Sequence, residues 1–506
     1  MRFLGKKIFF SFVFLIFSAI FWQAKRPVSN EELVSRHYEK LKRLGRPYLV
    51  DFFKRFPKGA DLHIHFLGAI YPNVWLAEAE KRGLFYSPES LEISERQKNG
   101  FLPISDAKSN FDWIRFYDLL ALRQNKTHDG FFSSVLFRKK LMSLLPIEEC
   151  FPSILEESLA DGARYLELMI GDPLFPSAFD RNFDRNNFAE AKRILARPVQ
   201  EFVENAKRFL DDCDRCAREK LQVNDSVYHP ASPICVRWIF EISRGPVDLQ
   251  KFYFQLFAAL TLTQEDERAA SINIAGLEDS PNAVNHFDEH LRIINELSQR
   301  FSKKINLHAG EMDVHSSLGS VVLRKRISTV LNKAVAIKRL GHCHSLFWDC
   351  NEDAFRDIRE RNLTIEVCPK SGEYICGLSG KDHPLHYFLS HKLPVVICTD
   401  DAGINLSCLT EEYVSVAMWA PYLNYRDFKR FAVCSLEASY LRGEGIYDKT
   451  GDGYRLKALF RDLQENEEKR AYILNNEKAY VEYRHALEME AFERYIVEVQ
   501  QNVGVQ

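Results

Sequence analysis

The sequence has no excess of basic residues. Its 506 residues include 68 Lys and Arg against 70 Asp and Glu, which gives a formal net charge of −2. A protein that neutralises a nucleic-acid backbone or an anionic membrane surface needs a cationic face. We therefore expect no nucleic-acid partner, and contact with a membrane only through an apolar segment.

Internal repeats, low-complexity tracts and long apolar runs are also missing, with one exception near the amino terminus. The run Ile8 to Trp22 is apolar apart from two serines. The basic residues Arg2, Lys6 and Lys7 precede it. This order is typical of an export signal, and the run is shorter than the ~20 residues of a membrane-spanning helix. Because the cleavage site is poor, an uncleaved anchor and a buried first helix are the alternatives. We expect a secreted or periplasmic protein, or one anchored by residues 1–26.

The eleven cysteines form no regular framework. Cys235, Cys368 and Cys398 lie in strand-like runs, where we expect them to be buried as small apolar residues. Cys213 and Cys216 have the spacing of a redox or zinc half-site, but no second pair completes it. The cysteines therefore neither support nor exclude export.

Short apolar or β-branched runs alternate with helical segments along most of the chain. Eight such runs are present: Ala60–His65, Arg164–Met169, Ile234–Ile242, Ser271–Ala275, Lys304–His308, Ala336–His342, Leu363–Cys368 and Pro394–Thr399. Eight strands alternating with helices predict an α/β fold, a (β/α)8 TIM barrel, whose catalytic groups lie at the carboxyl ends of the strands.

The interval between the first two runs is longer than one helix requires, which predicts an insertion at about residues 72–159. Within it we expect helices at Phe111–Leu122 and Phe131–Leu145, after a polar stretch without a period at Tyr86–Asn110. The whole chain then divides into a leader (1–26), an N-terminal helical segment (27–56), the barrel with its insertion (57–455) and C-terminal amphipathic helices that cover the barrel (456–506).

Polar side chains gather at the carboxyl ends of the predicted strands. His63 and His65 lie two residues apart, so their side chains face the same side of the first strand. Alone, they could be core histidines or metal ligands. With His308 after the fifth strand and Asp400 after the eighth, they make a set of three nitrogens and one oxygen that suits zinc and leaves room for a water.

Two further residues at strand ends suit proton transfer. Zinc lowers the pKa of a bound water to near 7. Glu311 could then donate a proton to a substrate, and His342 could take or hold the proton of the water. Each also has an ordinary explanation, since Glu311 could start a helix, Asp400 and Asp401 could cap one, and His342 could be a core histidine.

These residues lie in motifs that resemble the adenosine and AMP deaminase family of metal-dependent hydrolases. The motifs occur in the family's order between about residues 57 and 440: His63-x-His65-x-x-Gly68, Ala275-Gly276-Leu277-Glu278, His308-Ala309-Gly310-Glu311, Arg339-Leu340-Gly341-His342, Glu366 to Ser371, and Thr399-Asp400-Asp401. The leader, the long insertion and Thr127 to Phe132 look most like the secreted branch, the adenosine deaminase-related growth factors and their bacterial relatives.

The resemblance implies one zinc ion per chain, with the ligands His63, His65, His308 and Asp400. It also implies that Glu311 protonates the purine ring nitrogen beside the amino group and that His342 orients and deprotonates the attacking water. Asp401 would bind the water and the five-membered ring, and the backbone N–H of Gly276 would bind the other pyrimidine-ring nitrogen. Two-metal relatives carry a modified lysine in the fourth strand, and Ser271 to Glu278 contains none.

Three residues depart from the family pattern: Leu67, Gly372, which stands where many members have Asn, and Ala402, which stands where many have Pro. Compact adenosine deaminases carry an aspartate that binds ribose where this chain has Leu67. We expect ribose contacts to come from the insertion instead, and its candidate residues are Asp112, Trp113, His128 and Asp129.

The resemblance predicts deamination of adenosine or 2'-deoxyadenosine to inosine or deoxyinosine. Leu67 leaves open another 6-aminopurine, such as free or N6-substituted adenine or a 5'-modified nucleoside. No basic cluster accompanies the motifs, which disfavours an intact 5'-phosphate. A barrel that only binds a receptor or a glycan is the alternative from another class, but it would not need the complete metal set. Secreted relatives dimerise through extra amino-terminal helices, and residues 28–56 are shorter than those helices, so the sequence leaves a homodimer open.

Overall fold

The computed structural model describes residues 28–124, 126–312, 322, 324–349, 352–451 and 453–503. The predicted leader, residues 1–26, lies outside this range. Within the described part of the chain, no helix is long and apolar enough to cross a membrane.

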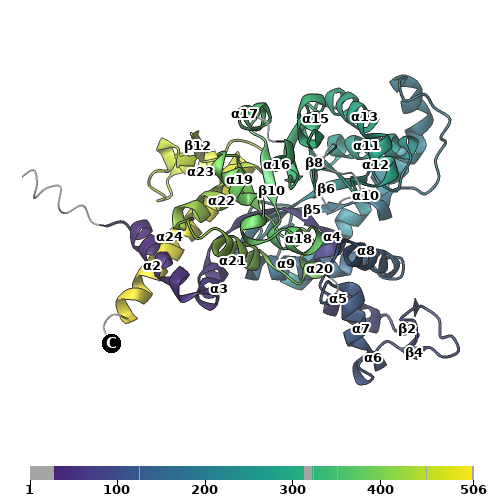
Figure 1. Cartoon of the computed structure of the whole chain (residues 1–506), viewed down its shortest axis with the longest axis horizontal. Helices are drawn as coiled ribbons and strands as arrows, with labels where there is room; N and C mark the ends of the chain where they lie inside the picture. Colours follow the sequence, from purple (N-terminus) through teal and green to yellow (C-terminus); the bar gives the residue numbers. More distant parts are fainter. Residues whose placement is uncertain are drawn as a thin grey trace, which may run out of the picture.

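Eight parallel strands form the centre of the molecule (Figure 1). They are β1 (Gly59–His65), β5 (Ala163–Ile170), β6 (Cys235–Ser243), β7 (Ala269–Ala275), β8 (Ile305–Ala309), β9 (Ile337–His342), β10 (Thr364–Val367) and β11 (Val395–Ile397). Each pairs with the next along the chain. All eight predicted strands are therefore present, and every end lies within two residues of its predicted bound.

The residues just after β11 return to β1 and close the sheet. Ile64 forms a parallel bridge with Asp400. The backbone N–H of Asp400 donates to the carbonyl of His63 at 2.8 Å, and the N–H of His65 donates to the carbonyl of Asp400 at 2.9 Å. The predicted (β/α)8 barrel is confirmed, and its closure brings the first and last polar strand ends side by side.

The helices that follow the strands cover the barrel because each has one apolar side. They are α9 (Phe151–Ala160), α10 (Phe188–Leu221), α11 (Leu249–Glu265), α12 (Pro281–Asn285), α13 (Phe287–Arg300), α15 (Arg326–Lys333), α16 (Leu346–Asp349), α17 (Glu352–Glu360), α18 (Pro369–Ile375), α19 (Leu385–Ser390), α20 (Ala402–Asn405), α21 (Leu409–Trp419) and α22 (Tyr425–Glu437). The strands they cover are buried on both faces, which is why the sequence shows them as continuous apolar runs.

The segment between β1 and β5 contains more helix than a single crossover needs. Its elements are α4 (Phe66–Ala69), α5 (Pro72–Lys81), β2 (Phe85–Tyr86), β3 (Ile93–Ser94), β4 (Leu102–Pro103), α6 (Asp106–Ser109), α7 (Asp112–Leu120) and α8 (His128–Met142). Helices α7 and α8 correspond to the two predicted ones. The three-stranded antiparallel sheet of β2, β3 and β4 was not predicted, because strands of two residues leave no readable alternation. In Figure 1 this sheet, α6 and α7 lie away from the barrel strands.

The chain termini pack together on another side of the barrel. The N-terminal helices α2 (Asn30–Leu44) and α3 (Arg46–Arg55) precede β1, and α23 (Glu467–Leu474) and α24 (Glu477–Val503) end the described chain. Tyr38 and Phe52 contact Phe428 of α22 and Phe492 of α24 through aromatic rings 5.3 to 5.6 Å apart. A hairpin of β12 (Tyr447–Thr450) and β13 (Gly453–Leu456) precedes α23, so the boundary that we placed at residue 456 falls within β13.

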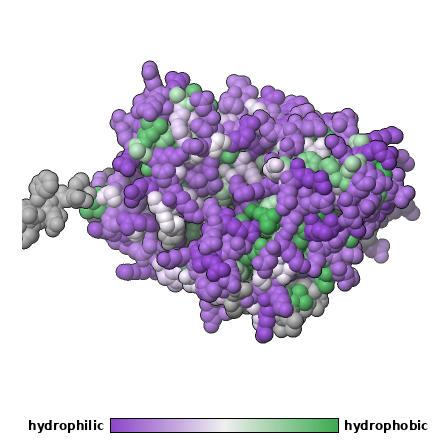
Figure 2. All heavy atoms as spheres, turned by 90° about the horizontal axis from the view of Figure 1, so that it is seen from above, coloured by the Kyte–Doolittle hydropathy of each residue, from purple (hydrophilic) through white to green (hydrophobic). Residues whose placement is uncertain are grey.

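The surface in Figure 2 is mostly hydrophilic, with hydrophobic residues gathered near the middle of the face shown. Ten of the cysteines lie in the described part of the chain, and none of them forms a disulfide there. Cys213 and Cys216 lie on α10, where both are buried. Their burial fits packing better than a zinc half-site.

Candidate metal centre and active site

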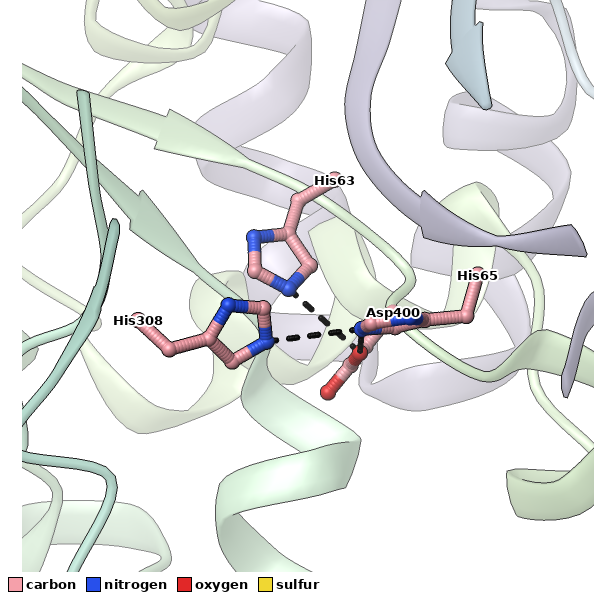
Figure 3. A group of neighbouring side chains, drawn as sticks. All are labelled: His63, His65, His308 and Asp400. Atoms are coloured by element: carbon pink, nitrogen blue, oxygen red, sulfur yellow. Dashed lines mark hydrogen bonds and ion pairs between the residues drawn. The ribbon is translucent and has the colours of Figure 1, made fainter. Parts of the chain in front are cut away.

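The four predicted ligands, His63, His65, His308 and Asp400, converge at the carboxyl end of the barrel (Figure 3). Nε2 of His65 lies 3.4 Å from Nε2 of His308, and Oδ1 of Asp400 lies 3.3 Å from Nε2 of His65 and 3.5 Å from Nε2 of His63. A tetrahedron whose ligands lie ~2.0 to 2.1 Å from a zinc ion has edges of about 3.3 to 3.4 Å. The observed separations therefore leave room for one ion of that size between the four atoms.

A second observation fits a cation at this point. Nε2 of His63 is buried and makes no hydrogen bond within the described part of the chain. A buried polar atom without a partner costs stability unless something else binds it. Three imidazole nitrogens and one carboxylate form a donor set that suits zinc.

Each ligand histidine also has a partner on its other ring nitrogen. Nδ1 of His63 lies 2.6 Å from a carboxylate oxygen of Glu366, and Nδ1 of His65 lies 2.8 Å from Glu241. A carboxylate that accepts the Nδ1–H fixes the ring orientation and leaves Nε2 free to bind metal.

The partner of the third ligand histidine, His308, is an amide and not a carboxylate. The amide of Asn273 lies 2.9 Å from Nδ1 of His308. Its oxygen has no hydrogen bond within the described residues when the nitrogen faces the ring. With the amide reversed, the oxygen accepts the Nδ1–H of His308, which again leaves Nε2 for metal.

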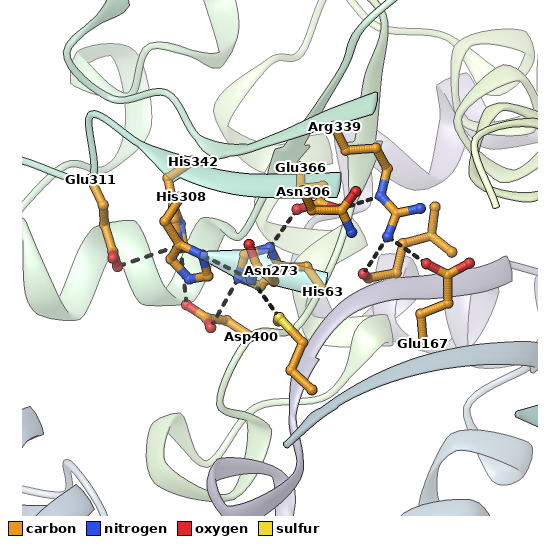
Figure 4. A network of polar contacts seen from close by, with 12 residues as sticks. His63, Glu167, Asn273, Asn306, His308, Glu311, Arg339, His342, Glu366 and Asp400 are labelled. Atoms are coloured by element: carbon orange, nitrogen blue, oxygen red, sulfur yellow. Dashed lines mark hydrogen bonds and ion pairs between the residues drawn. The ribbon is translucent and has the colours of Figure 1, made fainter. Parts of the chain in front are cut away.

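The partner of His63 belongs to a buried ion network (Figure 4). Nε of Arg339 donates to Glu366 at 2.5 Å, and the same guanidinium binds Glu167; all three side chains are almost wholly buried. Burial alone would raise the pKa of Glu366, but Arg339 and His63 hold it below its ordinary value. Glu366 is therefore ionised and can orient His63 permanently.

Glycines in the motifs allow the close approach of catalytic groups. A Cβ at Gly68 would lie 1.5 Å from a carboxylate oxygen of Asp401, and a Cβ at Gly341 would lie 2.9 Å from the ring of His63. At the neighbouring strand ends, His342 and Asp400 have φ of 62° and 64°, in the left-handed region that non-glycine residues seldom adopt. Two strained backbone positions therefore lie where the polar groups meet.

Glu311 and His342 lie beside the ligand set. Nε2 of His342 is 3.5 Å from a carboxylate oxygen of Glu311 and 3.9 Å from Asp400. Burial, and then the charges of Asp400 and Glu278, raise the pKa of Glu311 well above its ordinary value. Burial lowers the pKa of His342 well below its ordinary value. Glu311 is thus arranged to carry a proton and His342 to be neutral.

Glu278 positions the backbone of Glu311. Its carboxylate accepts the N–H of Glu311 at 3.0 Å and is held by Arg326 at 2.9 Å and Arg244 at 3.2 Å. Burial would raise the pKa of Glu278, but the two arginines hold it below its ordinary value. This motif residue therefore holds the backbone of Glu311, the candidate proton donor, in place.

Asp401 is the second acid of the site. Burial, and then the adjacent charge of Asp400, raise its pKa to about 8. Gly68 leaves room for its carboxyl group, as described above. A protonated Asp401 could donate a hydrogen bond to a substrate, whereas Asp400 is left as the ionised ligand.

A cavity of about 860 Å³ opens from these residues. Its lining includes Gly276, which follows β7, and the polar residues His65, His308, Glu311, Asp400 and Asp401. This volume lies within the range of small-molecule sites in enzymes.

Of the four residues that we expected to contact ribose, only two line this cavity. His128 and Asp129 do so, from the first turn of α8. Asp112 and Trp113 do not line it, and that part of the prediction is wrong. Asp112 is buried in α7, where it accepts from Tyr86 at 2.9 Å and pairs with Arg115 at 2.9 Å, and Trp113 packs on Tyr117. Helix α7 therefore supports the small sheet and does not reach the barrel mouth.

Sequence comparisons agree with the geometry. The adenosine deaminase family model matches residues 220–446. An adenosine deaminase of Clostridium perfringens is 25% identical over 175 residues, which make up 34% of this chain and 47% of that enzyme, so the match spans about half the length of this relative. An adenosine deaminase of Phlebotomus duboscqi is 20% identical over 445 residues, 81% of this chain and 78% of the relative.

Two solved structures share the fold. An Arabidopsis N6-mAMP deaminase superposes with a TM-score of 0.50 at 16% identity and covers 77% of this chain and 95% of its own. An amidohydrolase of Burkholderia ambifaria with bound Zn superposes with a TM-score of 0.52 at 15% identity and covers 88% of this chain and 94% of its own. The predicted resemblance to the adenosine deaminase family is confirmed. The narrower assignment to its secreted branch stays a prediction.

The motifs contain the four candidate ligands but not all the residues that contact them. Glu241 and Asn273 lie outside any role that we predicted, as does Arg138 of α8. The signal for the first two was available, because each is a polar residue inside a mostly apolar, buried strand. Arg138 gave no such signal, since an arginine in a helix with other cations is usually exposed.

Proposed function

We propose that this chain is a zinc-dependent aminohydrolase that converts adenosine or 2'-deoxyadenosine to inosine or deoxyinosine and ammonia. The observation that carries the proposal is the convergence of the three histidines and Asp400, with Glu311 and His342 beside them. Of these residues, His65, His308, Glu311 and Asp400 line the cavity. The family match supports the reaction class.

The ligand set would hold zinc through His63, His65, His308 and Asp400. When bound, zinc acidifies water and so supplies a nucleophile near neutral pH. Glu241, Glu366 and Asn273 keep the histidine rings turned toward that point.

The remaining residues handle protons and orient the purine. Glu311, kept protonated by its raised pKa, protonates the ring nitrogen beside the amino group. His342, kept neutral by its lowered pKa, accepts the proton of the attacking water. The oxygen of the water adds to the ring carbon, and the proton taken by His342 passes to the amino group. The carbon–nitrogen bond then breaks, ammonia leaves, and the proton of the added hydroxyl returns to Glu311. Asp401 and the N–H of Gly276 orient the base from the cavity lining.

A different 6-aminopurine is the second candidate, because Leu67 lines the same cavity and offers no hydrogen bond to a sugar. We also propose export and, for residues 1–26, either a leader or an anchor; the sequence alone supports these two points.

The test combines metal analysis with turnover. Purified protein should contain one zinc per chain and should release ammonia from adenosine, with the matching change in ultraviolet absorbance. Glu311→Gln keeps the size of the side chain but removes its proton, so we expect turnover to fall about 10²- to 10⁴-fold with zinc retained. Glu201→Gln, at an exposed position of α10, is the matched control. Turnover by Glu311→Gln at the control's rate would rule out the proposed proton donor.

A further inference from the structure

Helix α8 of the insertion carries a wholly buried arginine, Arg138. Its Nη1 donates to the carbonyls of Leu67 at 2.7 Å and Ile70 at 2.5 Å, and its Nε donates to the carbonyl of Leu120 at 3.0 Å. Within the described part of the chain, its hydrogen-bond partners are carbonyls and none is a carboxylate. A buried cation without a carboxylate partner is destabilising, and an apolar side chain would fill the same space without that penalty. The position therefore points to a requirement for the hydrogen bonds of a guanidinium.

The carbonyls that Arg138 binds lie at the ends of two helices. Leu67 lies in α4, Ile70 directly follows it, and Leu120 is the last residue of α7. The last carbonyls of a helix have no partner inside the helix, and a cation near them is favourable. Arg138 therefore caps both helices and joins the insertion to residues 66–70, the α4 turn, which directly follows the ligand strand β1.

The α4 turn also lies against the segment that follows β11. A Cβ at Gly68 would lie 1.5 Å from Oδ1 of Asp401, so this carboxyl group rests directly on the turn. A Cβ at Gly403 of α20 would lie 2.3 Å from the carbonyl oxygen of Ile70, which is one of the carbonyls that Arg138 binds. In Figure 1, α4, α8 and α20 lie side by side. A shift of the α4 turn would therefore displace Asp401.

Two further observations connect the insertion to Asp401. The backbone N–H of Leu122, just after α7, donates to the carbonyl of Ile404 in α20 at 2.8 Å. Burial lowers the pKa of Arg138 to about 9, and the charge of Asp401 opposes this shift. The guanidinium and this carboxyl group therefore attract each other across the α4 turn.

We propose that Arg138 is a positioning residue of the deamination, which holds the α4 turn and, through it, Asp401 in the place that the reacting purine needs. This inference rests on the proposed function, in which Asp401 orients the base. Arg138 acts through the turn and not on the substrate, because its side chain is wholly buried and its guanidinium donates to carbonyls. The helix of the insertion that lines the cavity thus also shapes the catalytic end of the barrel.

The first test is Arg138→Met, which keeps most of the length of the side chain and removes the charge and the donors. We expect kcat for adenosine to fall about 10²-fold, because a displacement of about 1 Å in the groups around the reacting atoms costs about that much. KM should change much less, since the rest of the cavity lining is retained. Zinc content, measured by elemental analysis, should equal that of the unmodified protein.

Arg237→Met is the matched control. Arg237 is also almost wholly buried and donates to the carbonyls of Tyr228 at 2.6 Å and Val236 at 2.9 Å, but it lies near the amino end of β6, away from the ligands. Both variants should lower the melting temperature, whereas only Arg138→Met should lower kcat. Equal kcat in the two variants would show that Arg138 contributes stability alone, and it would overturn the inference.

Two more variants separate positioning from stability. Arg138→Lys keeps the charge but not the planar fork of donors, so its kcat should lie between those of the unmodified protein and Arg138→Met. If Arg138→Met does not fold, Arg138→Lys decides the point, and an unreduced kcat would overturn the inference. Arg138→Ala leaves a gap beside the cavity, which Arg138 lines, and added guanidinium ion should raise its kcat. No gain at concentrations that leave the unmodified protein unaffected would count against the inference in the same way.

The unmodified protein distinguishes this inference from the function on which it rests. If protein that contains zinc releases no ammonia from adenosine or another 6-aminopurine, the proposed function fails and the inference fails with it. If the unmodified protein is active and Arg138→Met is as active as Arg237→Met, only the inference fails.

Discussion

The barrel end and the insertion differ in how firmly each fixes its side chains. At the barrel end, ligands come from strands whose pairing and closure leave them few alternatives, and every ligand histidine has a partner behind it. In the insertion, α8 reaches the cavity whereas α7 and the small sheet turn away from it. The comparison suggests that the barrel determines the chemistry and that one helix of the insertion determines which molecule enters.

Removing a ligand should produce the largest effect, because the remaining groups cannot replace it. In His308→Ala we expect loss of bound zinc and turnover below detection, since only two imidazoles and one carboxylate remain. Elemental analysis and ammonia release measure the two effects separately. His229→Ala, at an exposed loop position, should retain both. Full zinc content in His308→Ala would mean that other groups hold the metal.

The pH dependence of turnover tests the protonation states that the barrel end imposes. Because the pKa of His342 is lowered from 6.5, it is neutral at neutral pH, and kcat should fall on the acid side only below that value. Because the pKa of Glu311 is raised from 4.5, the proton needed for catalysis is retained above that value and is lost only on the alkaline side. Each limb should change about tenfold per pH unit.

A profile of kcat between pH 4 and pH 10, roughly the span between the ordinary pKa values of Asp and Lys, measures both limbs. An acid limb centred above the ordinary value of histidine would contradict a neutral, buried His342. A rise in kcat throughout the alkaline range would contradict Glu311 as the acid.

The residues behind the ligands should produce a smaller effect than the ligands themselves. Glu241→Gln keeps an oxygen near Nδ1 of His65 but removes the negative charge, so we expect zinc affinity or activity to fall about 10- to 100-fold. Competition with a chelator measures the affinity. Glu265→Gln at the end of α11, which pairs with Lys207 at the surface, is the control. An effect of Glu241→Gln no larger than that of the control would show that His65 needs no carboxylate partner.

The structure of the barrel end could be predicted from the sequence more fully than that of the insertion, and the reasons are physical. Strands buried on both faces appear as apolar runs, and the motif residues follow them directly, so the strands and the convergence of the ligand set could be predicted. The partners of the ligands required knowing which strands are neighbours. The inward turn of Arg138 and the burial of Asp112 required the packing of α4, α7 and α8, which leaves no local pattern in the sequence.

The smallest effect is expected in α7, and it tests the comparison most sharply. Trp113 packs on Tyr117 outside the cavity lining, so Trp113→Ala should change kcat/KM for adenosine by less than about 2-fold, since residues that do not touch substrate seldom affect its binding. Phe132→Ala in α8 is the matched aromatic deletion within the lining and should change KM measurably. Steady-state kinetics of both variants decide the point. If Trp113→Ala raised KM as much as Phe132→Ala, α7 would have to approach the substrate, and the division between a supporting and a selecting part of the insertion would be wrong.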